Sequence, residues 1–127
     1  SYNLFEKLKI DNFSVLPGSE LKLLKGLELG CDGIITATCN LTANLSRKVY
    51  EEFIKKKLQT SNELLCNVRS AFDQFNLISS LHSIMADEDE IYKNVLPPLS
   101  LLDEKDKNKL KEDLKKLNFK LGFLDAI

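Results

Sequence analysis

Residues 12–38 read NFSVLPGSELKLLKGLELGCDGIITAT, and this stretch decides the fold that the sequence predicts. Its outer segments, 12–16 and 33–38, are short, apolar and β-branched, as is typical of buried strands. Between them leucines recur at helical spacing, which predicts a helix near Glu20 to Leu29. A strand, a helix and a strand joined by short loops form a β-α-β unit, so the two strands should run parallel.

Turn residues separate the three predicted elements. Pro17 and Gly18 end the first strand, and the hydroxyl of Ser19 can cap the helix that follows. Gly30 stands where a glycine commonly ends a helix. Two parallel strands do not make a stable sheet by themselves, so they need further neighbours.

The composition of the chain argues against several classes of function. The chain has 127 residues, and 18 basic side chains nearly balance 19 acidic ones, so it lacks the basic excess of nucleic-acid binders. Its three cysteines show no CxxC spacing and it has one histidine, which argues against a zinc site and for thiols in a reducing, cytoplasmic setting. No apolar run approaches the roughly 20 residues of a membrane span. No cofactor is predicted.

Helices dominate the rest of the chain. Residues 39–43 are predicted to be a loop, and a short helix is predicted to open at 87–90. Pro97-Pro98 should block helix and strand alike. Apolar periodicity and capping residues predict helices over 1–9, 44–57, 62–75 and 78–86, and a last one that follows Asp103.

The predicted architecture is uneven, with two parallel strands near the start and helices after them. Either the chain dimerises through its strands, or it is the C-terminal part of a larger α/β protein. Three features favour the larger protein: the start inside a helix, the missing initial Met, and a final strand that only helices follow. We therefore expect further residues upstream of Ser1.

Three segments together resemble a known family. They are FSVLPGSE at 13–20, LELGCDGIITATCN at 27–40 and VLPPL at 95–99. In their order and spacing they resemble the dihydrodipicolinate synthase and N-acetylneuraminate lyase superfamily of pyruvate-dependent class I aldolases. In that family the seventh barrel strand ends in Ser-Gly-Asp-Asp or a similar turn, and the eighth reads Gly-x-Ile-Ser. A Pro-Leu element precedes the last helix.

The resemblance implies an α/β fold, the C-terminal portion of a (β/α)8 TIM barrel with its last two parallel strands, plus a helical C-terminal extension. Because a full barrel takes around 250 residues, residues 1–60 would be the last β/α units and 61–127 the extension. It implies a lyase that forms a Schiff base with pyruvate and uses an aldehyde or a 2-keto acid, as a homotetramer when complete. The Schiff-base lysine would lie upstream, so this chain alone should be inactive.

The candidate substrate-binding residues are Gly18, Ser19, Glu20, Ile35 and Thr36. Barrel enzymes work at the C-terminal ends of their strands. There Gly18 lets the backbone approach a ligand, and the amides that open a helix attract oxygen atoms. By resemblance, Ser19 stands where the synthases usually have Asp, and Thr36 replaces Ser. The alternative is structural: Ser19 only caps the helix, Glu20 only complements its dipole, and Ile35 and Thr36 only pack.

Other functions remain open at this stage. Within the same family, Ser19-Glu20 in place of two aspartates leaves room for a 2-keto-3-deoxy sugar acid aldolase or dehydratase. The chain could instead be a standalone helical interaction module that dimerises through its strands. A barrel that binds other phosphates or sugars is a third alternative, although the sequence has no glycine-rich phosphate loop for a nucleotide.

Overall fold

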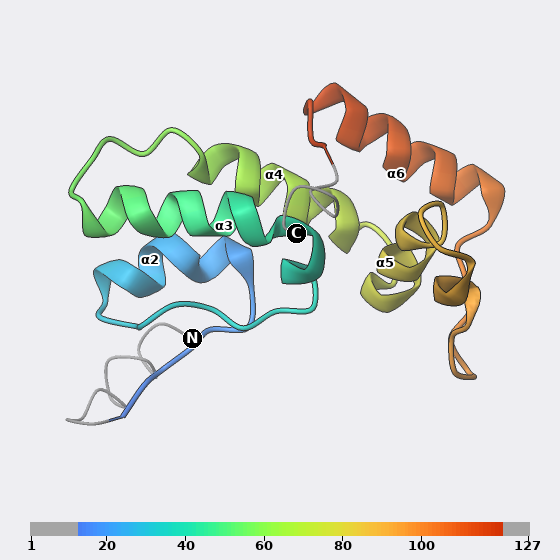
Figure 1. Ribbon diagram of the computed structural model, residues 1–127, viewed down its shortest axis with the longest axis horizontal. Helices are drawn as coiled ribbons and strands as arrows, with labels where there is room; N and C mark the ends of the chain where they lie inside the picture. The colour runs from blue at the N-terminus through green and yellow to red at the C-terminus, as the bar shows by residue number, and fades with distance from the viewer. Residues whose placement is uncertain (1–12, 121–127) are drawn as a thin grey trace. The chain divides into compact units, whose positions relative to one another are not determined.

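The computed structural model describes residues 13–120, so the helix predicted at 1–9 lies outside the described residues. The described residues fall into two compact units, 13–66 and 67–120. Figure 1 shows their helices in chain order. The predicted division at 60/61 concerns a barrel and its extension in a larger protein, and it stays a prediction.

The first helical segment of the first unit agrees with the sequence. A short 3-10 helix, η1 (Glu20–Lys22), leads directly into α2 (Leu23–Glu28). The hydroxyl oxygen of Ser19 accepts a hydrogen bond from the amide of Leu21 at 3.3 Å, so the predicted cap is confirmed. Gly30 follows the helix with a φ of 90°, a backbone conformation that glycine adopts without strain.

The predicted strands are wrong as regular strands, because none of the residues from 13 to 120 forms one. The segments are nevertheless extended and joined by two hydrogen bonds: Asp32 N–H to Val15 O at 3.2 Å and Ile35 N–H to Pro17 O at 3.1 Å. Both segments advance together between these bonds, so they run in the same direction, as expected. The step is two residues on one segment and three on the other, and this extra residue, as in a β-bulge, interrupts a regular ladder.

Helix α3 (Cys39–Ile54) begins earlier than the sequence predicted. The loop predicted at 39–43 is wrong, and so is the extension of the second strand to Thr38. The hydroxyl oxygen of Thr36 accepts the amide of Cys39 at 3.1 Å, and Thr42 N–H donates to Thr38 O at 2.9 Å. A side chain thus satisfies one of the amides that a helix start leaves unpaired, so the helix can begin directly after the extended segment.

The C-terminal end of α3 also differs from the prediction, which ran to Lys57. Lys56 has a φ of 53°, and the amide of Lys57 bonds back to Glu52 O at 2.8 Å. The amide of Lys56 donates to Phe53 O at 3.0 Å. This pair of bonds around one left-handed residue is the Schellman motif, which ends the helix at Ile54.

A small apolar core holds the first unit together. Leu23 and Leu27 of α2 pack with Val49 of α3 and with Leu65. Val49 and Leu65 are completely buried. Each such side chain stabilises the fold by roughly 1.5–3 kcal/mol relative to an exposed one. Half-buried apolar side chains extend the cluster: Ile34, Leu45, Tyr50 and Phe53.

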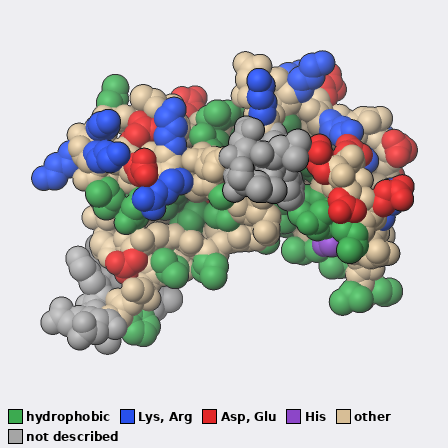
Figure 2. All heavy atoms as spheres, in the orientation of Figure 1, with side chains coloured by type: hydrophobic (Ala, Val, Ile, Leu, Met, Phe, Trp, Pro, Cys, Tyr) green, Lys and Arg blue, Asp and Glu red, His purple; other side chains and the backbone are tan. Residues whose placement is uncertain are grey.

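The extended segments carry apolar side chains on the surface of the first unit. Phe13 is 52% exposed, Leu16 45% and Ile35 71%. Figure 2 shows hydrophobic side chains on the surface where these segments run. Paired extended chains with bare apolar groups and unpaired edges are suited to contact further protein.

The second unit is helical, and the sequence predicted its elements closely. Helix α4 (Asn62–Asp73) crosses from the first unit, and α5 (Leu77–Met85), η2 (Glu90–Lys93) and α6 (Glu104–Lys116) follow. The start of α4 agrees with the prediction, the other bounds of α4 and α5 differ by one or two residues, and η2 begins three residues later than predicted. Asn76, Asp89 and Asp103 cap α5, η2 and α6 with their side-chain oxygens.

The core of the second unit is apolar. Phe72 and Leu110 are completely buried, and Leu81, Ile84 and Leu114 are nearly so. None of the helices between residues 13 and 120 is long and apolar enough to cross a membrane. The same described residues contain no group of three or more His, Cys, Asp or Glu side chains that could hold a metal ion.

Candidate functional site

A buried carboxylate joins the ends of the two extended segments. Glu20 is completely buried, and its Oε1 atom accepts hydrogen bonds from the hydroxyls of Thr36 and Thr42, each at 2.8 Å. The hydroxyl of Thr38 donates to the same oxygen. Hydrogen bonds to an ionised acceptor are about twice as strong as neutral ones, so this cluster compensates for the burial of a charged side chain.

The four side chains come from η1, from the second extended segment and from the start of α3. Glu20 begins η1, directly after the first extended segment. Thr36 lies at the end of the second segment, Thr38 is the N-cap of α3, and Thr42 lies in the first turn of that helix. Thr38 and Thr42 are completely buried. The carboxylate therefore fixes the end of one segment to the end of the other.

The residues that the sequence predicted to bind substrate differ in their exposure to solvent. Gly18 is exposed, Ser19 and Thr36 are half-buried, and Ile35 is largely exposed, whereas Glu20 is enclosed. A Cβ atom on Gly18 would lie 4.0 Å from Ile35 O, so the two segment ends are neighbours at this point. The structure brings all five residues to one end of the extended pair. Their role in binding stays a prediction.

Sequence reasoning did not find Thr38 and Thr42 as members of the cluster. Their contacts with Glu20 join residues 18 and 22 positions apart, and periodicity gives no sign of them. The available signal was the group of threonines at 36, 38 and 42, in and just after the second predicted strand. An acidic residue after one predicted strand and several threonines at the end of the next form a pattern that can be sought in a sequence.

The charge of Glu20 also reaches a thiol. Burial raises the pKa of the Cys66 thiol, and the negative charge of Glu20 raises it further. Both effects disfavour a thiolate. Cys66 is therefore a poor nucleophile where it lies.

A hollow of about 370 Å³ lies beside α3 in the first unit. It is lined by residues of the 32–34 segment and by Cys39, Ser46, Arg47 and Tyr50. The guanidinium of Arg47 lies 5.2 Å from the centre of the Tyr50 ring, and its Nε is 3.0 Å from Glu51 Oε1. Of the candidate site residues, none lines this hollow.

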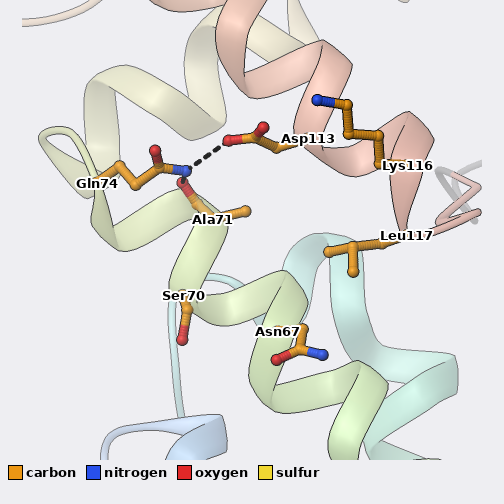
Figure 3. Close-up of a pocket in the computed structure, with 7 residues that line it drawn as sticks. All are labelled: Asn67, Ser70, Ala71, Gln74, Asp113, Lys116 and Leu117. Carbon is orange, nitrogen blue, oxygen red and sulfur yellow. Dashed lines mark hydrogen bonds between the residues drawn. The ribbon is translucent and has the colours of Figure 1, made fainter.

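A second hollow, of about 300 Å³, lies in the second unit between α4 and α6 (Figure 3). Gln74 Nε2 donates to Asp113 Oδ2 at 2.9 Å across it. This hydrogen bond and the one from Lys109 hold the pKa of the Asp113 carboxyl below its usual value. The remaining lining residues are Asn67, Ser70, Ala71, Lys116 and Leu117.

Two solved structures share the fold of this chain. The chain superimposes on dihydrodipicolinate synthase DapA-2 from Bacillus anthracis with a TM-score of 0.77 and 20% identity, over 90% of this chain and 40% of that one. It superimposes on YagE, a prophage protein of the dihydrodipicolinic acid synthase family from E. coli K12 solved in complex with pyruvate, with a TM-score of 0.66 and 24% identity. That match covers 85% of this chain and 38% of YagE. The chain thus spans about two fifths of either structure.

The sequence matches the dihydrodipicolinate synthetase family over residues 2–117. The chain belongs to this family, and the resemblance seen in its three motifs is confirmed. No individual curated protein matches the sequence.

Proposed function

We propose that this chain is part of a pyruvate-dependent lyase of the class I aldolase type, which condenses pyruvate with an aldehyde or cleaves a 2-keto acid. The match to the dihydrodipicolinate synthetase family over residues 2–117 carries the proposal. The likeness to two solved structures, of which the chain covers 40% and 38%, supports it. One of these structures contains pyruvate, as its description states.

In the proposed enzyme, the chain supplies the last two β/α units of a (β/α)8 barrel and its helical extension. The two extended segments that run in the same direction, with exposed Phe13, Leu16 and Ile35, support this arrangement. The preceding barrel strands would cover these apolar groups and complete the hydrogen bonding of the segments. Assembly into a homotetramer and a cytoplasmic location belong to the same proposal.

The chemistry of this class begins with a lysine amine that attacks the carbonyl of pyruvate. A neutral amine in a desolvated pocket is the nucleophile, water is lost, and an imine forms. We place this lysine in the part of the barrel that precedes residue 1. The residues of this chain then bind the second substrate.

Within the site, Gly18, Ser19, Ile35 and Thr36 would line the approach of the second substrate. Their location at one end of the extended pair, with Gly18 and Ile35 exposed, supports this role. Glu20 belongs to the same site, and because its side chain is enclosed it would act through its threonine partners. Ser19 in place of an aspartate favours a 2-keto-3-deoxy sugar acid aldolase or dehydratase as the second candidate reaction.

Borohydride trapping tests the proposal on the intact protein that carries this chain. Pyruvate with borohydride should convert the imine to a stable secondary amine, which peptide mass spectrometry locates. We expect one modified lysine, outside residues 1–127, and no modification without pyruvate. The isolated chain should take up no label. A protein that is never modified would contradict the proposed function, and a modified lysine within the chain would contradict the placement of the nucleophile.

A further inference from the structure

The hydroxyl groups around Glu20 have a fixed direction. A threonine hydroxyl carries one proton and two lone pairs, whereas an ionised carboxylate only accepts. Thr36 and Thr42 each donate to Glu20 Oε1 at 2.8 Å, and Thr38 donates to the same atom. The proton of each of these hydroxyls is thereby directed inward.

Thr36 is the least buried of the four residues in the cluster. Thr36 is half-buried and follows Ile35, which is 71% exposed, while Thr38 and Thr42 are completely buried. Its oxygen already accepts the amide of Cys39 at 3.1 Å, and it lies 3.2 Å from the hydroxyl oxygen of Thr38. With its proton directed to Glu20, the Thr36 hydroxyl can offer an approaching molecule only an acceptor.

We propose that Glu20 is a positioning residue that sets the direction of the Thr36 hydroxyl, so that the site selects a neutral, hydroxyl-bearing aldehyde as its second substrate. This inference rests on the proposed aldolase function. A substrate hydroxyl can donate to the Thr36 oxygen, whereas a carboxylate or phosphate brings only acceptors. The buried charge of Glu20 adds repulsion against an anion.

A positioning role and a merely structural role of Glu20 lead to different kinetics. If the carboxylate served only to hold the segments together, its loss would slow all aldehydes alike. If it fixes the hydroxyl direction, its loss should change the choice between aldehydes. Glu20→Gln is the matched substitution, because it keeps the shape of the side chain and replaces one acceptor oxygen by an amide that donates.

The test measures kcat/KM on the intact protein with pyruvate and three aldehydes. Glyceraldehyde is neutral and hydroxylated, propionaldehyde is neutral without a hydroxyl, and succinic semialdehyde carries a carboxylate. Rates are divided by the fraction of protein that traps pyruvate with borohydride. We expect the unmodified protein to prefer glyceraldehyde, and Glu20→Gln to lower the glyceraldehyde to succinic semialdehyde ratio about tenfold, the value of one charged hydrogen bond. The glyceraldehyde to propionaldehyde ratio should fall as well.

A pair of substitutions at Thr36 keeps the test decisive if Glu20→Gln fails to fold. Thr36→Val removes the acceptor with little change of shape and should lower the preference for glyceraldehyde. Thr36→Ser keeps the hydroxyl and should restore it. A protein that prefers succinic semialdehyde, or ratios that stay the same in Glu20→Gln and Thr36→Val, would overturn the inference.

Failure of the proposed function gives a different result. An intact protein that traps no pyruvate overturns the aldolase proposal and with it the substrate class. Amide hydrogen exchange at Cys39 then tests the direction of the hydroxyls, because the Cys39 N–H donates to the Thr36 oxygen. Glu20→Gln should speed this exchange, and exchange that is as slow as in the unmodified protein would overturn the positioning role.

Discussion

In the first unit, residues 13–66, two carboxylates are buried, whereas in the described part of the second, 67–120, the buried polar side chains are serines. Glu20 and Glu52 each accept several hydrogen bonds from threonines. Glu52 accepts the amide of Thr60 at 2.8 Å and the hydroxyl of Thr60 at 3.0 Å. Buried charges with complete sets of partners fix loops in one geometry, while apolar packing mainly supplies stability.

This difference indicates that the two units have different roles. The first unit carries the ends of the extended segments, where precise loop geometry would matter for a ligand. The second unit contains helices with good caps and an apolar core, and it gives a scaffold. Substitutions in the two units should therefore have different consequences, and the following experiments compare them in order of expected size.

The largest effect is expected in the core of the second unit. Leu110 is completely buried, so Leu110→Ala leaves a cavity and should lower the free energy of unfolding by about 2–5 kcal/mol. Urea titration of the intact protein, followed by helical circular dichroism, measures the change. Leu96→Ala is the control, because Leu96 is 83% exposed. If both substitutions lower the free energy of unfolding equally, Leu110 does not belong to an apolar core of the second unit.

A smaller loss is expected at the buried polar cluster of the first unit. Thr38→Val keeps the shape of the side chain but removes one donor to Glu20 Oε1, and Thr38 is completely buried. The free energy of unfolding should fall by about 1–3 kcal/mol, because a buried carboxylate loses a partner. Thr38→Ser retains the hydroxyl and should cost less. Urea titration measures both variants. If Thr38→Ser is less stable than Thr38→Val, packing of the methyl group, rather than the hydrogen bond, dominates at this position.

The smallest effect is expected at a partly exposed ion pair in the second unit. Lys107 Nζ lies 2.6 Å from Asp87 Oδ1, and Lys111 pairs with the other oxygen. Partial burial raises the pKa of the Asp87 carboxyl, but the hydrogen bonds and charges of the two lysines outweigh it and leave this pKa below its usual value. The ion pairs therefore stabilise the fold above the usual pKa of an aspartate, and this contribution is lost as the pH falls through the lowered pKa.

Asp87→Asn should accordingly cost about 0.2–1 kcal/mol near neutral pH and nothing in strong acid. Unfolding free energies measured across the acid range give the difference between the two proteins at each pH. Glu90→Gln is the control, since the Glu90 side chain is 87% exposed in its pair with Lys93. If the loss of stability in Asp87→Asn grew as the pH falls, its pH dependence would be the opposite of the expected one and would contradict this account.

Sequence periodicity was sufficient for the second unit. Helices α4, α5 and α6 follow apolar spacing, and the residues that cap α5 and α6 have short polar side chains next to the first turn. These signals are local: the cap of α6, Asp103, lies three residues from the amide that it accepts. Local interactions leave a pattern in the sequence, so the prediction succeeded there.

The first unit was predicted less well because its geometry depends on distant partners. The β-branched run from 33 to 38 favours a strand, yet the segment ends at Thr36 and helix α3 begins three residues later. What stabilises this start is the contact of Thr36 and Thr38 with Glu20, 16 and 18 residues earlier. The resemblance selected Glu20 and Thr36 as site residues but could not reveal that they touch, nor that Thr38 and Thr42 join them.

The extra residue between the two backbone hydrogen bonds has a consequence for chirality. Gly33, with a φ of 157°, lies in this step, where an added Cβ would meet its first neighbour, a Leu16 methyl carbon, at an unstrained 3.7 Å. Space is therefore available, and the obstacle to L-alanine is the handedness of the backbone, at a cost of about 1–3 kcal/mol. The mirror-image residue meets no such obstacle. A D-amino acid introduced at position 33 by chemical synthesis would avoid this backbone strain, and it would have less conformational entropy to lose on folding than glycine.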